Sequence, residues 1–133
     1  MTDKLIVLAV DDNLQQLNEF KTMLGQKYDL RTVKAASGAI SFLNNNKIDV
    51  ILLDIDMPNI SGFEFLGDIR KIPSYFLTPI IIVSGNKGQE FFKEARSSGA
   101  NAVLTKPVDP NTLINAIEKA NAEAGKRARE INE

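Results

Sequence analysis

Five short apolar runs recur along the chain, each bounded by polar or turn-forming residues. An uninterrupted apolar run of this length is typical of a strand that is buried on both faces of a parallel sheet. The second run is more mixed than the others. The predicted strands are LIVLAV (5–10), DLRTV (29–33), DVILLD (49–54), PIIIVS (79–84) and AVLT (102–105).

Between these runs, apolar residues return every three or four positions, as they do on one face of a helix. After the first predicted strand this stripe consists of Leu14, Leu17, Phe20 or Lys21, and Leu24. Comparable stripes follow the other four strands. Strands that alternate with helices predict a parallel sheet with helices on both faces, and right-handed crossovers reduce the topologies to a few.

Helix start signals support this division. Three pairs have the spacing of a capping box: Asp12 with Gln15, Ser61 with Glu64, and Asn86 with Gln89. A fourth signal, Asp109 before Pro110, is typical of an N-cap followed by proline at the first helical position. We therefore expect one domain over residues 1–122, followed at 123–133 by an extension of the last helix or a frayed tail.

The amino-acid composition excludes several kinds of binding and catalytic site. The chain of 133 residues has a net charge of −1, which leaves no excess of basic residues for direct nucleic-acid binding. It contains no cysteine and no histidine, so a thiol nucleophile and a histidine base are excluded. Any metal would be held by oxygen atoms, which favours a hard cation such as Mg²⁺ or Ca²⁺.

The hydrophobic pattern also bears on location. No apolar run approaches the roughly 20 residues that a membrane helix needs. The N-terminus becomes acidic too early for a signal peptide. We therefore expect a cytoplasmic protein that has no membrane contact.

Polar residues gather where the predicted strands end. The carboxyl ends of parallel strands lie at one edge of a sheet, and ligands bind there. These ends carry Asp11 and Asp12, Asp54 and Asp56, Ser84 and Gly85, and Lys106 and Pro107. Two like charges about 4 Å apart repel by roughly 1 kcal/mol in bulk water and about 4 kcal/mol at an effective dielectric of 20. We expect Lys106 and a Mg²⁺ ion to offset this repulsion.

Each of these residues has an ordinary structural explanation when taken alone. Asp12 or Ser84 could cap a helix, and Asp54 or Asp56 could belong to a turn. Lys106 could be a solvated surface lysine. Their joint position at one sheet edge favours a functional site instead.

Four segments in this arrangement resemble the receiver (response regulator) family of two-component signalling. They are VDDN (10–13), LLDIDMPNISG (52–62), IIIVSG (80–85) and LTKP (104–107). The resemblance covers about residues 4–122 and implies a flavodoxin-like doubly wound (βα)5 fold with strand order 2-1-3-4-5. It also implies a signalling phosphoacceptor, and not an enzyme with sustained turnover.

The resemblance assigns roles to the acidic residues. Asp54 matches the phosphoacceptor, which attacks a phosphoryl group held on a kinase histidine. Asp11 and Asp12 match the acidic pair that binds Mg²⁺, and Asp54 would share in this site. Asp56 matches the position whose main-chain carbonyl is a metal ligand and whose side chain influences hydrolysis of the aspartyl phosphate.

The same resemblance extends to the other strand ends. Ser84 and Lys106 match residues that contact phosphoryl oxygens. Asn86, and Gly85 in the loop before it, match positions that modulate the response. Pro107 matches a proline that usually follows a cis peptide bond.

One position departs from the family pattern. The family usually has Tyr or Phe three residues before the lysine, where this chain has Val103. A β-branched side chain has little rotamer freedom and no ring that could turn inward. We therefore expect smaller phosphorylation-linked changes at the fifth strand than at residues 84–90.

The implied partners are a sensor histidine kinase or a histidine phosphotransfer protein, and a downstream protein bound through the fourth helix, fifth strand and fifth helix. Three other functions stay open. The DxD at Asp54 and Asp56 resembles that of aspartate-nucleophile phosphatases. A flavin-binding electron carrier has a similar topology. However, the first loop of this chain carries carboxylates, which would repel the phosphate of a flavin. A pseudo-receiver would keep the fold only as an interaction module.

Overall fold

A computed structural model describes residues 4–56 and 62–132. Its strands are β1 (Ile6–Val10), β2 (Asp29–Val33), β3 (Val50–Leu53), β4 (Ile80–Ser84) and β5 (Ala102–Thr105). Its helices are α1 (Leu14–Leu24), α2 (Ala36–Asn45), α3 (Gly62–Arg70), the 3₁₀ helix η1 (Pro73–Tyr75), α4 (Gln89–Ser97) and α5 (Pro110–Asn132). Each predicted strand is present, with ends that differ by at most one residue.

The five strands form one parallel sheet in the order β2-β1-β3-β4-β5, as the resemblance implied. In the register, Val10 lies beside Val33 and Leu53, and Ser84 lies beside Thr105. The carboxyl ends of the strands therefore lie side by side at one edge of the sheet, and the residues that follow them are brought together there.

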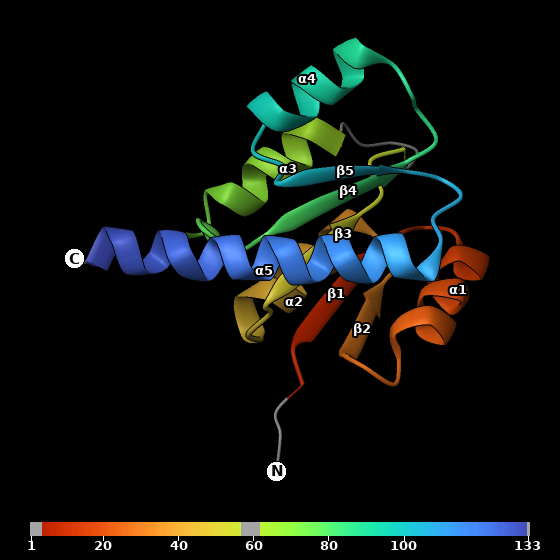
Figure 1. The fold of residues 1–133 in the computed structure, drawn as a ribbon, viewed down its shortest axis with the longest axis horizontal. Helices are drawn as coiled ribbons and strands as arrows, with labels where there is room; N and C mark the ends of the chain where they lie inside the picture. The colour runs from red at the N-terminus through yellow and green to blue at the C-terminus, as the bar shows by residue number, and fades with distance from the viewer. Residues whose placement is uncertain (1–3, 57–61, 133) are drawn as a thin grey trace.

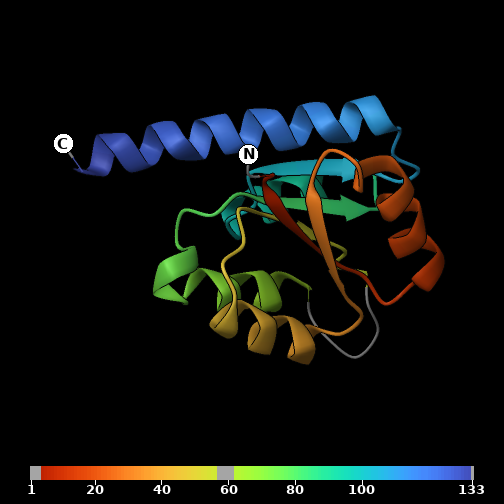
Figure 2. The same cartoon turned by 90° about the horizontal axis from the view of Figure 1, so that it is seen from below.

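Helices cover both faces of the sheet (Figure 1). One core cluster joins α1 and α5 to residues such as Ala9, Leu52 and Ile81. The alternate strand residues, such as Leu8 and Ile51, belong to a second cluster with α2, α3 and α4. Figure 2 shows α5 on one side of the sheet and α2 and α3 on the other. Burial on both faces explains why β1, β3 and β4 read as continuous apolar runs, whereas the edge strand β2 is only partly buried and more mixed.

The last helix continues through Gly125 to Asn132, and its C-terminal part extends past the sheet (Figure 1). Its start has the expected cap, because the backbone N–H of Thr112 donates to Asp109 Oδ2 at 2.9 Å. Of the alternatives for residues 123–133, the helical extension is the one observed up to residue 132. In the described part of the chain, no helix is both long and apolar enough to span a membrane.

Two predicted capping boxes are wrong. Helix α1 begins one residue later than expected, so Asn13 is the N-cap and its side chain accepts from the Gln16 backbone N–H. Helix α4 has Gly88 at its N-cap, and Asn86 Oδ1 instead accepts from the Gly88 backbone N–H at 2.8 Å. The third pair includes Ser61, which lies outside the described residues.

One member of the predicted α1 stripe is also wrong. Leu14 is 52% exposed, whereas Leu17, Phe20 and Leu24 are buried. Leu14 is the first residue of α1, ahead of the turns whose apolar side packs on the sheet and α5. The stripe therefore begins one turn later than the spacing alone indicated.

Candidate functional site

The polar residues that follow four strands meet at the carboxyl edge of the sheet. Asp54 follows the central strand β3, and its backbone N–H donates to the Val10 carbonyl at 2.9 Å. Asp11 follows β1 on one side, and Ser84 ends β4 on the other. The backbone N–H of Lys106, the residue after β5, donates to the Ser84 carbonyl at 2.8 Å. This hydrogen bond holds Lys106 beside the end of β4.

Three carboxylates form the centre of this site. Asp11, Asp12 and Asp54 each offer one oxygen, and these oxygens all lie within 4.8 Å of one another. Asp11 and Asp54 are 1% and 5% exposed, while Asp12 is exposed to solvent. Mg²⁺ prefers carboxylate oxygens together with water, so this donor set fits a Mg²⁺ ion.

Lys106 is the cation of the site. Its Nζ lies 3.3 Å from Asp11 Oδ2 and 3.5 Å from Asp54 Oδ2. One ammonium charge between two carboxylates leaves the group negative. Burial raises the pKa of Asp54 to about 6, and the charge of Asp11 acts in the same direction, against the hydrogen bond from Asp56 and the charge of Lys106.

The two buried carboxylates are oriented by local turns. Asp11 Oδ1 accepts the backbone N–H of Asn13 at 2.9 Å, and Asp54 Oδ1 accepts the backbone N–H of Asp56 at 2.9 Å. Each aspartate thus binds the amide two residues further on, as aspartate does in turns. This leaves Oδ2 of both residues facing Lys106. The role of Asn13 as helix cap and partner of Asp11 was not predicted from the sequence, although an aspartate two residues before a helix cap is a usable signal.

Gly62, the first residue of α3, lies very close to Ile55. A Cβ atom on Gly62 would lie 2.1 Å from the Cβ of Ile55, which separates the two aspartates Asp54 and Asp56. Any side chain at residue 62 would therefore displace this part of the site. The need for this close approach to Ile55 explains why α3 begins with glycine.

The side chain of Asp56 contacts the end of β4. Ser84 is fully buried, and its hydroxyl donates to Asp56 Oδ2 at 2.6 Å. The Gly85 backbone N–H donates to the same oxygen at 3.2 Å, and the Asn86 backbone N–H donates to Ser84 Oγ at 3.1 Å. The sequence did not predict this link between Asp56 and Ser84, because the two residues are 28 positions apart.

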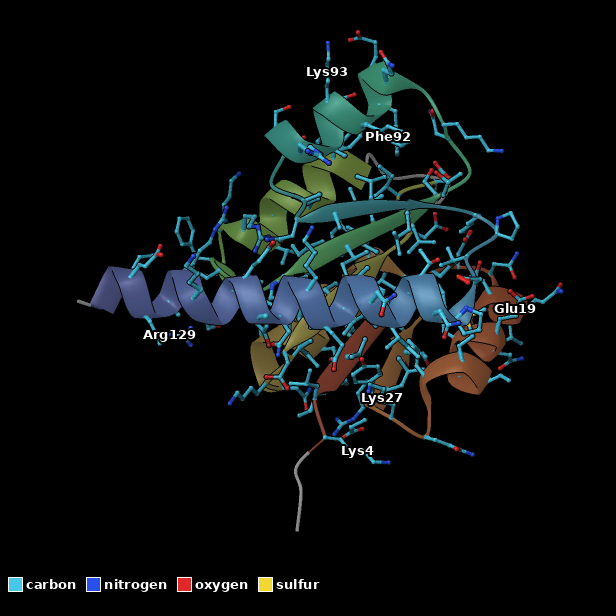
Figure 3. All side chains as sticks on the ribbon, in the orientation of Figure 1. Lys4, Glu19, Lys27, Phe92, Lys93 and Arg129 are labelled. Carbon is cyan, nitrogen blue, oxygen red and sulfur yellow. The ribbon has the colours of Figure 1, made fainter. Side chains whose placement is uncertain are left out.

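The remaining predicted positions lie around this centre. The peptide bond between Lys106 and Pro107 is cis, as the resemblance implied. Val103 is half-buried on β5 and packs against the core on the α4 side of the sheet. Beside it is a hollow of about 400 Å³, which Phe92 and Lys93 of α4 help to line (Figure 3).

Comparison with known proteins explains this arrangement. The model of the response regulator receiver domain family matches residues 7–118. The chain belongs to this family. The receiver domain is the signalling module of two-component systems.

Three bacterial proteins are examples of those similar to this chain in sequence or structure. Protein PilH of Pseudomonas aeruginosa is 35% identical over 114 residues, which cover 84% of this chain and 93% of PilH. The chemotaxis response regulator CheY4 of Vibrio cholerae superposes with a TM-score of 0.83 at 30% identity, covering 88% of this chain and 98% of CheY4. The sensor kinase/phosphatase CqsS of V. cholerae is 32% identical, but the match spans only 16% of that protein.

Proposed function

We propose that this receiver domain accepts a phosphoryl group on Asp54 from a phosphohistidine of a sensor kinase or a histidine phosphotransfer protein. An Asp54 oxygen attacks phosphorus, the P–N bond breaks, and its electron pair stays on the imidazole nitrogen, which is then protonated. The observation that supports this proposal is the buried Asp54 carboxylate at the centre of the acidic group, with Lys106 Nζ at 3.5 Å.

The three carboxylates of the site, Asp54 included, would hold a Mg²⁺ ion. Asp11, Asp12 and Asp54 supply side-chain oxygens, and the main-chain carbonyl of Asp56 is the further ligand that we propose. When bound, Mg²⁺ offsets the negative charge of the carboxylates and of the phosphoryl oxygens. Asp54 needs no histidine base, because a carboxylate is already a nucleophile once it is ionised.

Lys106 and Ser84 would contact the transferred group. Lys106 already lies between Asp11 and Asp54, so its ammonium is close to any group attached to Asp54. The Ser84 hydroxyl is engaged with Asp56 Oδ2, so it must leave this carboxylate before it can donate to a phosphoryl oxygen. Such an exchange would also disturb the loop after β4, because Gly85 donates to the same Asp56 oxygen.

Transfer of the signal would then proceed through residues 84–90 more than through Val103. The hydrogen bonds of Ser84, Gly85 and Asn86 form a continuous path from the site to the start of α4. A downstream protein would read the change on the face made by α4, β5 and α5. The cytoplasmic location expected from the sequence stays a prediction.

Intact-mass measurement after incubation with acetyl phosphate and Mg²⁺ tests the phosphoacceptor. We expect the mass of one phosphoryl group to be added per chain, no addition to Asp54→Asn, and none when EDTA replaces Mg²⁺. Equal modification of Asp54→Asn would show that another residue is the acceptor. An unmodified wild-type chain would favour a pseudo-receiver, and continuous turnover of a phosphomonoester would favour a phosphatase.

A further inference from the structure

A second polar hollow lies at the opposite edge of the sheet from the acidic site. It has a volume of about 690 Å³ and is lined by the end of α3, residues 76–77, residues 96–101 and the middle of α5. Residues 76–77 and 96–101 precede β4 and β5, whereas the acidic site follows these strands. The two sites are therefore separated by the length of the sheet.

The side chains around this hollow carry an excess of positive charge. Arg70, Arg96, Lys119 and Arg127 line it together with one carboxylate, Glu123. Among the residues that the structure describes, none of the four cations takes part in an ion pair. This concentration contrasts with the chain as a whole, whose net charge is −1.

Arg70 is the most firmly held of these cations. Its guanidinium is half-buried and donates to the carbonyl oxygens of Gly99 at 2.8 Å and Thr78 at 2.6 Å, and to Asn101 Oδ1 at 2.8 Å. These acceptors are neutral, so they satisfy its N–H groups without balancing its charge. Burial lowers the pKa of Arg70, and the charge of Arg127 acts in the same direction, so an anion in the hollow would be favourable.

We propose that this hollow binds an acidic segment of a protein partner, in which two or more Asp or Glu residues flank an apolar side chain. Lys119 and Arg127 are eight residues apart on α5, or roughly 12 Å along the helix axis. This span exceeds a single small anion and suits several carboxylates. Phe76 lines the same hollow and is 64% exposed, so it offers an apolar contact in addition to the charges.

The chain contains matched variants for a test. Arg127→Gln removes a cation of the hollow. Arg129→Gln makes the same change two residues further on, at a side chain that does not line the hollow and lies on the side of α5 away from α4 (Figure 3). Glu123→Gln removes the one carboxylate. Residues of α5 that face the sheet are untouched, so all three variants should fold like the wild type.

The probe is the blocked peptide acetyl-Asp-Glu-Leu-Glu-Asp-amide, titrated into ¹⁵N-labelled full chain in about 0.15 M salt, where exposed charges farther apart than about 8 Å are screened. We expect saturable amide shifts at residues 96–101 and 119–127. Arg127→Gln should weaken binding by about two- to fivefold, the range for exposed charge pairs. Arg129→Gln should leave the affinity unchanged, and Glu123→Gln should increase it.

Other results would overturn the proposal. Equal weakening by Arg127→Gln and Arg129→Gln, or shifts spread over all surface lysines, would mean non-specific attraction. Tighter binding of inorganic phosphate or of an oligothymidylate at these residues would assign the hollow to a different ligand class. The titration uses unphosphorylated protein, so its outcome does not depend on whether Asp54 accepts phosphate.

Discussion

Replacing Asp54 by Asn should stabilise the metal-free protein at neutral pH. The neutral amide keeps Oδ1 as the acceptor of the Asp56 backbone N–H and removes a buried charge. Burial raises the pKa of Asp54 from 3.8 to about 6. Because one pKa unit corresponds to about 1.4 kcal/mol, ionisation of this carboxyl lowers the free energy of unfolding by at most about 3 kcal/mol.

The pH dependence follows from the direction of this shift. Well below the unfolded-state pKa of 3.8, the carboxyl is protonated in both the folded and the unfolded chain, so its ionisation has no effect on stability. As the pH rises toward 6, the unfolded chain ionises first and is favoured. Above about pH 7 the full destabilisation is present in the wild type and absent from Asp54→Asn.

Urea denaturation in EDTA at about pH 4 and about pH 8 measures this difference. We expect Asp54→Asn to gain up to about 3 kcal/mol over the wild type at the higher pH and little at the lower. Asp68→Asn, at an exposed site on α3, is the control and should change little at either pH. An advantage of Asp54→Asn that is the same at both pH values would refute the reasoning.

Mg²⁺ provides a second arm of this experiment. A ligand that binds only the folded state stabilises it by mass action. Mg²⁺ should therefore raise the stability of the wild type at about pH 8 and remove most of the advantage of Asp54→Asn. If Mg²⁺ leaves both proteins unchanged, the proposed metal site is wrong.

Three further predictions concern single features of the structure. Lys106→Gln removes the ammonium that lies 3.5 Å from Asp54, so it should raise the pKa of Asp54 further and slow the modification of Asp54 by acetyl phosphate. Intact-mass measurements over time give this rate, and an unchanged rate would contradict the role of Lys106. Gly99→Ala should lower the free energy of unfolding by about 1–3 kcal/mol, because residue 99 has φ +113° and a Cβ would lie 3.1 Å from Leu66 Cδ2. Urea denaturation measures this difference, and an unchanged stability would show that the backbone adapts. Beryllofluoride with Mg²⁺ should shift amide NMR signals more at residues 84–90 than around Val103, and the reverse order would contradict signalling through the loop after β4.

The sequence by itself determined the secondary structure and the edge at which the site forms. Apolar runs and helical stripes are local patterns, and burial of both sheet faces lengthens the apolar runs of the inner strands, whereas the exact helix starts were not all predicted. Chain alternation of strand and helix forces the strands to be parallel, so Asp11, Asp54, Ser84 and Lys106 had to follow strands that end at one edge.

Only the tertiary structure decided which of these side chains contact one another. Lys106 lies between Asp11 and Asp54, and Ser84 donates to Asp56. These contacts join residues that are far apart in the sequence, so they depend on strand order, register and side-chain rotamers. The cationic hollow around Arg70 is likewise decided only by the tertiary structure. Its side chains come from α3, α4 and α5, and no local pattern brings these helices together.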